Sequence, residues 1–277
     1  MNNNYVEINL HCSSENAEIL VALIGDFPFD MFEEYDGGVK AYIKQKDYTE
    51  DITAYLGELQ DTLDFSYEKN VIEAANWNQP WEDNFHPLTI GDFCGIRADF
   101  HASLQPIEYE LIINPKMAFG TGHHETTHLA IELMQHLDLA GKKVLDYGGG
   151  TGILSILASK LGAKEIIAVD NEVPAYESTI ENAAINQVDN ITSIYGILND
   201  VKASGFDIIL ANINRNVIIG SLDLMYEKLV PNGIMITSGF LVADEQIIMQ
   251  SIENQGFSCL ERRVKGDWMC LKLRKKN

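Results

Sequence analysis

Hydrophobic residues follow two different periods along the chain, and the change of period divides it into two parts. In the first 70 residues, short alternating segments predict four strands and apolar residues at helical spacing predict two helices, in the ranges 5–12, 17–24, 31–35, 39–43, 47–59 and 63–67. Asp36-Gly37-Gly38 predicts a hairpin turn between two of the strands. The order β-α-β-β-α-β is typical of a small α+β domain of the ferredoxin-like kind.

Apolar runs that alternate with helical segments fill the rest of the chain. We expect seven strands, of which the last two pair antiparallel and close the sheet; the first begins at Lys143, and the others cover 165–169, 191–195, 206–214, 233–237, 256–264 and 267–273. Helices are expected at 173–186 and 242–254, and two short strands, at 93–100 and 110–113, come before the sheet. The fold class is therefore α/β, with a Rossmann-like, mainly parallel sheet of seven strands.

The two patterns set the expected domain boundaries. A small domain covers residues 1–70, a linker covers 71–90, and the large α/β domain covers 91–277. The linker contains Trp77, Pro80, Trp81 and Pro87, which predict an ordered connector because proline restricts the backbone and tryptophan packs.

Composition places the chain among globular proteins. Of its 277 residues 46% are hydrophobic, and no stretch approaches the roughly 20 apolar residues of a membrane span. The first residues have no basic segment followed by an apolar one, so we expect no signal peptide. The four cysteines, at 12, 94, 259 and 270, form no C-x-x-C pair, which fits a reducing compartment. We expect a cytoplasmic protein with no membrane partner.

The chain is strongly acidic. Its net charge is −21, and residues 1–80 carry 16 acidic residues against 4 lysines. This charge repels the phosphates of nucleic acid and favours a basic partner, so direct nucleic-acid binding is not expected. An acidic surface that only keeps the protein soluble explains the charge equally well.

The most informative stretch is Asp146-Tyr147-Gly148-Gly149-Gly150-Thr151-Gly152, which follows an apolar run and precedes a helical pattern. It predicts a strand, a tight turn and a helix, in which glycines permit the turn and a close approach to a ligand. A dinucleotide fingerprint needs a small residue at position 153, where this chain has Ile153. The spacing G-x-G-x-G is instead typical of S-adenosylmethionine sites. A glycine turn without a ligand is the alternative.

Two further residues end strands where ligands of such sheets bind. Asp170 follows the second strand, 22 residues after Gly148, where a carboxylate accepts hydrogen bonds from both ribose hydroxyls. Asn212 ends the fourth strand at the carboxyl edge of the sheet. Asn214 is expected to cap the next helix.

A glycine-rich loop at 114–124 runs into a helix that we expect to extend to about Leu137. Its hydroxyls and free N–H groups are expected beside the Gly148–Gly152 turn, where they hold a polar ligand. His124-Glu125-Thr126-Thr127-His128 also matches H-E-x-x-H, the zinc metalloprotease pattern. The match lies at the start of the helix and no third ligand follows, so we expect no metal and keep a metalloprotease as an alternative.

Four motifs together resemble the PrmA family, the methyltransferases of ribosomal protein L11. They are Ala118-Phe119-Gly120-Thr121-Gly122-His123-His124-Glu125-Thr126-Thr127, the stretch from Asp146 to Leu154, Ala168-Val169-Asp170, and Ala211-Asn212-Ile213. Their order and spacing agree with the family over most of the chain, and so does the small N-terminal domain. The first motif is the most specific, because the glycine turn occurs in many methyltransferases.

The resemblance implies S-adenosylmethionine as the cofactor and lysine side chains and the N-terminal amine of L11 as the methylated groups. It implies that residues 1–70 recognise this basic protein and that 91–277 form the S-adenosylmethionine-dependent methyltransferase domain. Asn212 is the expected catalytic residue, and the expected cofactor-binding residues are Phe119, Thr121, Gly122, Thr127, Gly148, Gly150, Asp170 and Asn212.

The chain departs from the family pattern in places. Gly149 stands where cysteine is common, Thr151 where serine is common, and Glu125 where proline is frequent. A methyltransferase for another protein or a small molecule, and a nucleotide-binding regulator without catalysis, therefore remain alternatives. For a direct displacement, the substrate amine must first lose its proton. His123 and His124 are candidates for the base, or residues that only shape the loop.

Overall fold

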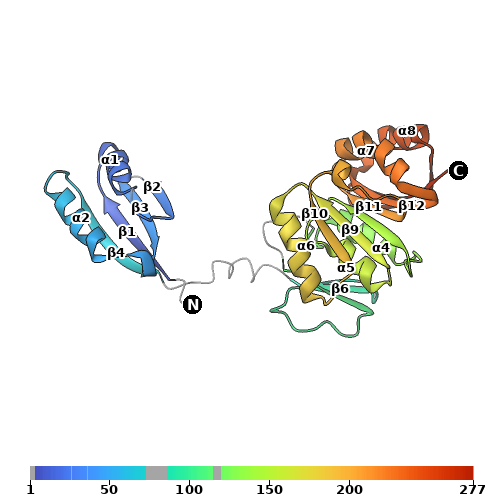
Figure 1. The fold of residues 1–277 in the computed structure, drawn as a ribbon, viewed down its shortest axis with the longest axis horizontal. Coiled ribbons are helices and arrows are strands. Elements are labelled where there is room, and N and C mark those ends of the chain that lie inside the picture. The colour runs from blue at the N-terminus through green and yellow to red at the C-terminus, as the bar shows by residue number, and fades with distance from the viewer. Residues whose placement is uncertain (1–3, 26, 36, 73–85, 115–119, 277) are drawn as a thin grey trace. The chain divides into compact units, whose positions relative to one another are not determined.

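The computed structural model describes residues 4–25, 27–35, 37–72, 86–114 and 120–276 (Figure 1). The chain divides into two compact units, Met1–Phe85 and His86–Asn277. Each unit has a hydrophobic core of its own, one in the first and two in the second. Each is therefore described by itself.

The first unit folds as the sequence predicts, with two helices and a four-stranded sheet of order β2-β3-β1-β4. All neighbouring strands are antiparallel, which is the ferredoxin-like arrangement. The elements are β1 (Tyr5–His11), α1 (Ser14–Ile24), β2 (Met31–Tyr35), β3 (Gly38–Lys44), α2 (Glu50–Gln60) and β4 (Ser66–Ile72).

Two local predictions in this unit have different outcomes. Ser13 caps α1, since its side chain accepts a hydrogen bond from the Asn16 N–H at 3.3 Å. The strand predicted at 63–67 is displaced and forms at Ser66–Ile72. The Leu63 N–H still donates to the Leu59 carbonyl at 2.8 Å, so this apolar residue belongs to the turn that directly follows α2.

The predicted linker falls largely outside the described residues. Trp77, Pro80 and Trp81 lie in the segment 73–85, which is not described. β4 ends at Ile72, and the next described element begins at Leu88. The domain boundaries at 70 and 90 stay a prediction.

The second unit begins with a small three-stranded sheet of order β5-β6-β7. Its strands are β5 (Leu88–Ile90), β6 (Cys94–Arg97) and β7 (Tyr109–Ile112). The sequence predicted the last two, and β5 was missed because three residues are too few to show a period. Ile96 and Leu111 pack in the same core as the first helices of the main sheet.

The main sheet has seven strands in the order β10-β9-β8-β11-β12-β14-β13, and β14 runs antiparallel to both of its neighbours. This confirms the predicted Rossmann-like fold and its antiparallel closing pair. The strands are β8 (Lys143–Tyr147), β9 (Glu165–Asp170), β10 (Ile191–Tyr195), β11 (Phe206–Asn212), β12 (Leu229–Leu241), β13 (Phe257–Lys265) and β14 (Trp268–Lys275).

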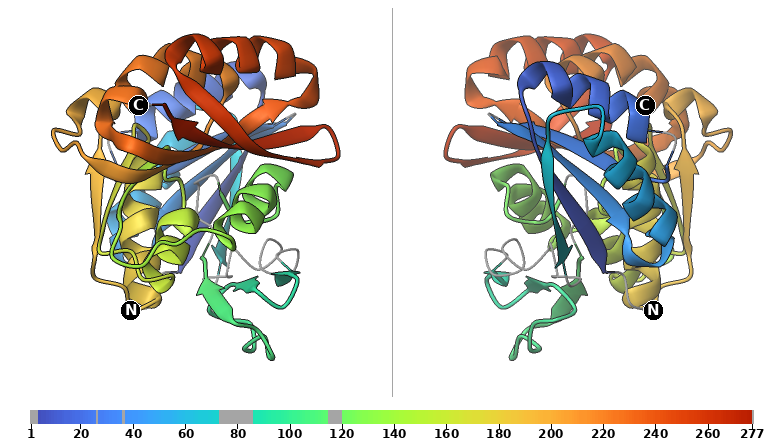
Figure 2. Two further views of the ribbon diagram at one scale, coloured as in Figure 1. Left: turned by 90° about the vertical axis from the view of Figure 1, so that its right-hand side faces the viewer. Right: turned by 90° about the vertical axis from the view of Figure 1, so that its left-hand side faces the viewer.

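Helices cover both faces of this sheet (Figure 2). α4 and α5 contribute to the core on one face, and α7 and α8 to the core on the other. The helices are α4 (Glu125–Met134), α5 (Ile153–Lys160), α6 (Val173–Ile185), α7 (Arg215–Lys228) and α8 (Glu245–Gln255). None of the helices in the described residues is long and apolar enough to cross a membrane.

Several element ends differ from the predictions. α4 ends at Met134 instead of Leu137, because the last N–H groups bond three residues back and tighten the chain into a turn. The helix expected from Val242 begins at Glu245, after the 3₁₀ turn Val242–Asp244. β12 is longer than the predicted 233–237, since it pairs with β11 on one side and β14 on the other.

The strand order reverses at one point of the sheet, and the surface outside the carboxyl ends of the strands at this point is called the crevice below. β8 lies between β9 and β11, and the chain winds outward from it in both directions. In open α/β sheets the ligand binds at this reversal, outside the carboxyl ends of the strands. The predicted glycine turn follows the carboxyl end of β8, so fold and sequence select the same place.

Candidate functional site

The glycine turn after β8 requires its glycines for two physical reasons. Gly148, Gly150 and Gly152 have φ angles of 75°, 56° and 80°. Residues with a Cβ atom rarely adopt such positive φ angles. A Cβ on Gly148 would lie 2.1 Å from Cγ2 of Ile213, the residue after β11. The turn thus brings the ends of β8 and β11 into direct contact.

Asp170 is attached to this turn. Its Oδ2 accepts a hydrogen bond from the Gly150 N–H at 2.9 Å, and its Oδ1 accepts one from the Glu172 N–H at 3.0 Å. These two backbone groups orient the half-buried carboxylate at the end of β9. Since each carboxylate oxygen has two acceptor positions, Asp170 retains the capacity to bind hydroxyl groups.

Thr127 and Asn212 meet on the other side of β8. Thr127 is buried in the first turn of α4, and Asn212 ends β11. The Asn212 Nδ2 donates to the Thr127 Oγ1 at 3.2 Å. The structure therefore joins two predicted site residues that the sequence could place only separately.

The loop before α4 lies against the glycine turn. The Gly120 carbonyl accepts a hydrogen bond from the Thr151 Oγ1 at 2.5 Å. Gly122 has a φ of 94°, and a Cβ there would lie 2.6 Å from Cδ1 of Ile96. Thr121 stands between these two glycines. Phe119, the eighth predicted cofactor residue, lies outside the described residues, and its role stays a prediction.

A second carboxylate is buried beneath the turn. Asp146 is 1% exposed, and its Oδ2 accepts hydrogen bonds from the Ser155 N–H at 3.1 Å and the Ser155 Oγ at 2.6 Å. The pKa of Asp146 is raised to about 6, mainly by burial and in smaller part by the charge of Asp170, while the hydrogen bonds from Ser155 oppose the rise. Two carboxylates and a glycine cradle suit a ligand that carries hydroxyl groups and positive charge, which fits S-adenosylmethionine.

His124 and His128 do not share a metal site in the described part of the chain. His124 is the N-cap of α4, where its Nδ1 accepts the Thr126 N–H at 3.3 Å, and its ring packs edge-on against Trp268. The His128 Nε2 instead contacts the Glu132 Oε1 at 3.1 Å, one turn along the helix. The described residues contain no group of three metal-ligating side chains. This geometry does not favour the metalloprotease alternative.

His123 also shapes the loop. Its Nε2 donates to the His86 carbonyl at 2.8 Å, and its Nδ1 lies 3.3 Å from the Thr121 Oγ1. Both ring nitrogens of His123 thus have partners, and so does the Nδ1 of His124, which is bonded to Thr126 in the first turn of α4. The contacts favour the loop-shaping interpretation over a general base.

Three contributors to the site were missed from the sequence. The Thr179 Oγ1 donates to the Gly150 carbonyl at 3.1 Å, and the Asn182 Nδ2 donates to the Thr151 carbonyl at 2.9 Å. Gly239 lets the end of β12 approach Ile213, whose carbonyl oxygen would lie 2.1 Å from a Cβ there. For Thr179 and Asn182 the available signal was the spacing of two polar residues three apart in the helix predicted at 173–186.

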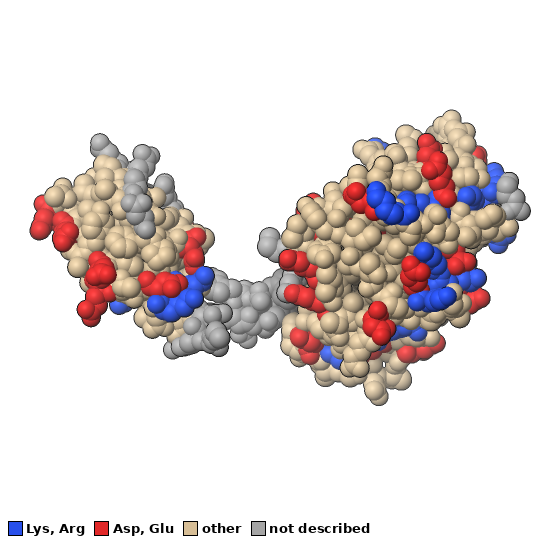
Figure 3. Space-filling model, viewed as in Figure 1, with Lys and Arg blue, Asp and Glu red and all other residues tan. Residues whose placement is uncertain are grey.

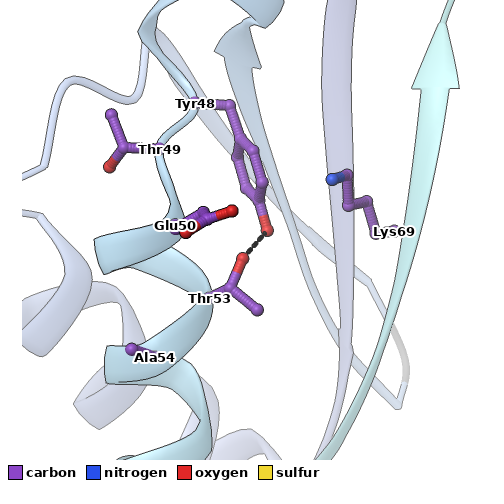
Figure 4. Close-up of a pocket in the computed structure, with 6 residues that line it drawn as sticks. All are labelled: Tyr48, Thr49, Glu50, Thr53, Ala54 and Lys69. Atoms are coloured by element: carbon purple, nitrogen blue, oxygen red, sulfur yellow. Dashed lines mark hydrogen bonds between the residues drawn. The ribbon is translucent and has the colours of Figure 1, made fainter.

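The first unit has a groove of its own, shown in Figure 4. Residues from the start of α2 and from β4 line it: Tyr48, Thr49, Glu50, Thr53, Ala54 and Lys69. The Tyr48 hydroxyl and the Thr53 Oγ1 are hydrogen-bonded at 2.7 Å, and the Lys69 Nζ lies 4.2 Å from the centre of the Tyr48 ring. None of the predicted site residues belongs to this groove.

Solved structures share this architecture. A ribosomal protein L11 methylase from Lactobacillus delbrueckii subsp. bulgaricus aligns with a TM-score of 0.63 at 29% identity, over 70% of this chain and 100% of that one. A methyltransferase from Pyrococcus furiosus, at 17% identity and a TM-score of 0.51, covers 60% of this chain and 90% of its own. The second likeness supports the fold alone.

Sequence comparison covers nearly the whole chain. A ribosomal protein L11 methyltransferase of Phocaeicola vulgatus is 38% identical over 265 residues, which is 94% of each protein. One of Porphyromonas gingivalis is 39% identical over 261 residues, covering 92% of this chain and 89% of its own. The family model described as ribosomal protein L11 methyltransferase (PrmA) matches residues 29–276. The chain therefore belongs to the ribosomal protein L11 methyltransferase (PrmA) family.

Proposed function

We propose that this chain uses S-adenosylmethionine to methylate amino groups of ribosomal protein L11, namely lysine side chains and the N-terminal amine. The observation that carries the proposal is the extent of the family match. It runs from residue 29 to 276 and so includes most of the first unit as well as the cofactor crevice. A match confined to the crevice would support only the reaction and not the substrate.

Different residues around the crevice bind different parts of the cofactor. Asp170 accepts the ribose hydroxyls, and Gly148 and Gly150 provide the close backbone approach. Thr121, Gly122 and Thr127, together with Phe119, line the side formed by the loop before α4. When bound, S-adenosylmethionine supplies a methyl group on a positively charged sulfur. The buried Asp146 contributes negative charge beneath the same turn.

Asn212 orients the substrate amine. Its Nδ2 is held by the Thr127 hydroxyl, and this leaves its Oδ1 as an acceptor for an amine N–H. An amine in this position keeps its lone pair for the reaction, and the gain comes from fixed orientation of the two reactants. With the loop histidines engaged, the amine gives up its proton to solvent before it enters the site.

The first unit recognises the protein substrate. Acidic side chains lie scattered over its visible face in Figure 3, and residues 1–80 carry 16 acidic residues against 4 lysines. A basic substrate is attracted by this surface, whereas nucleic acid is repelled. Residues 1–70 thus form the recognition domain and 91–277 the methyltransferase domain. Because the substrate is a ribosomal protein, the enzyme acts in the cytoplasm.

Methyl transfer tests the proposal directly. Purified ribosomal proteins are incubated with the full-length chain and S-adenosylmethionine labelled in its methyl group, and the products are separated and digested. Label in L11, on lysine side chains and the N-terminal amine, is the expected result. Label in a different protein would refute the substrate and retain the reaction, and the absence of binding to S-adenosylmethionine in calorimetry would refute both.

A further inference from the structure

Three buried polar side chains lie on one face of α6 and its C-cap, and two of them bond to the glycine turn of the candidate site. Thr179, Asn182 and Asn186 are 1%, 1% and 8% exposed. They recur at spacings of three and four residues, which places them on the same side of the helix. Buried amides are destabilising unless they are hydrogen-bonded, so the partners of these residues show what the face does.

The Asn182 carboxamide joins the glycine turn to a distant part of the chain. Its Nδ2 donates to the Thr151 carbonyl at 2.9 Å, and its Oδ1 accepts from the Asn114 N–H at 3.0 Å. The Thr151 Oγ1 in turn donates to the Gly120 carbonyl at 2.5 Å. Asn114 and Gly120 are the described residues on either side of the segment 115–119. Asn182 and Thr151 therefore attach both of these residues to the glycine turn.

We propose that Asn182 is a positioning residue for S-adenosylmethionine. It sets the distance between the two sides of the crevice, the glycine turn on one side and the loop with Thr121, which leads into α4, on the other. The inference rests on the proposed function, because it takes this crevice to be the cofactor site. Asn182 is almost fully buried, so it acts through Thr151 and Asn114 and not by contact with the ligand.

Asn186 provides a matched control one helical turn further on. Its Oδ1 accepts from the Ile112 N–H at 3.0 Å, and its Nδ2 donates to the Ile112 carbonyl at 2.6 Å and the Asn182 carbonyl at 2.8 Å. These hydrogen bonds fix the end of β7 and do not involve the glycine turn. Asn182→Asp and Asn186→Asp make the same chemical change, since each keeps the acceptor, removes the donor and adds a carboxylate in a buried place.

The experiment compares these two variants with the wild-type chain at full length. Calorimetry is expected to show that Asn182→Asp weakens S-adenosylmethionine binding by about tenfold or more, because the hydrogen bond to the Thr151 carbonyl is lost and a carboxylate oxygen faces that carbonyl instead. Asn186→Asp is expected to stay within about twofold of wild type, although both variants lower the melting temperature. In the ligand-free proteins, backbone hydrogen exchange of the glycine turn at 148–152 is expected to rise only in Asn182→Asp, because only this variant loses the hydrogen bond to the Thr151 carbonyl.

Equal weakening by the two variants overturns the inference, because loss of stability alone would then explain it. If wild-type protein fails to bind S-adenosylmethionine, the proposed function fails and the inference with it. Should Asn182→Asp not fold, Thr151→Val removes the hydroxyl that holds Gly120, and Thr151→Ser keeps it. Thr151→Val is then expected to weaken binding more than Thr151→Ser, and equal effects of these two variants overturn the inference.

Discussion

The negative charge of the buried Asp146 lowers the stability of the folded protein at neutral pH. The carboxylate is 1% exposed and has hydrogen bonds from Ser155, yet burial raises its pKa to about 6 from a usual value of 3.8. An acid whose pKa is higher in the folded state favours folding most when it is protonated. Its contribution is complete below pH 3.8 and is lost as the pH rises through about 6. At neutral pH the charged form is therefore kept at a cost to stability.

Asp146→Asn tests this cost. A neutral amide keeps an acceptor for the Ser155 N–H and removes the buried charge, so we expect the free energy of unfolding at pH 8 to rise by about 2 kcal/mol. The gain is expected to shrink towards pH 4, where the wild-type carboxyl is protonated. Urea unfolding of both proteins at the two pH values measures this difference.

The same variant is expected to bind S-adenosylmethionine more weakly, since a negative charge near a positively charged ligand is lost. Ser155→Ala serves as the control of opposite sign, because it removes a donor to the carboxylate and should destabilise the protein at pH 8. A variant Asp146→Asn that is less stable than wild type at both pH values would contradict this account of Asp146.

At the scale of the elements, two helices begin directly after strands that end in residues of the candidate site. α7 begins directly after Asn212 and Ile213, and the Asn214 side chain accepts the Val217 N–H at 3.1 Å. The sequence predicted this cap, because capping depends only on residues close together in the chain. α6 begins after Asp170, and its N-cap, Glu172, makes no side-chain capping bond.

Asn214→Ala is expected to lower the free energy of unfolding by about 1 kcal/mol, the usual effect of losing a side-chain cap. Glu172→Ala is the matched control in the same unit and is expected to change stability by less than about 0.5 kcal/mol. Urea unfolding followed by circular dichroism measures both. If the two substitutions had equal effects, the capping role of Asn214 would be wrong.

Element positions were predicted well where periodicity was long and poorly where it was short. The alternation over 5–12 and the apolar runs of the main sheet correspond to observed strands. The strand near residue 65 was displaced because Leu63 is apolar for the packing of a helix end, which looks the same in sequence as a strand position. The short β5 takes its strand conformation from pairing with β6, and no local pattern encodes that.

At the scale of the whole molecule, the two units differ in their cores and in their charge. The first unit has its own core, built from residues such as Ile8, Leu20 and Leu56, and the second unit has two cores of its own. The crevice residues described above all belong to the second unit, while much of the acidic charge belongs to the first. This separation allows cofactor binding and substrate recognition to be tested apart.

A shortened chain that begins at His86 is expected to bind S-adenosylmethionine within about twofold of the full-length affinity, and to lose about tenfold or more in kcat/KM for L11. Calorimetry measures the affinity, and methyl transfer measures kcat/KM. Equal kcat/KM for the two chains would remove the recognition role of the first unit.

The full-length chain is expected to show a KM for L11 that rises with salt, since screening weakens attraction between an acidic enzyme and a basic substrate. Methyl transfer at several salt concentrations measures this KM.

The sequence by itself determined those features that depend on neighbouring residues. Strand and helix types, the glycine turn at 148–152 and the Asn214 cap all follow from local periodicity and backbone preference. Only the tertiary structure decided which of these meet. It joined Thr127 to Asn212, residues 85 positions apart, and made Asn182 a link between Asn114 and Thr151. It also packed the ring of His124 edge-on against Trp268, a contact that the H-E-x-x-H pattern does not indicate. Such partners depend on strand order and helix packing, which bring residues together irrespective of their separation in the chain.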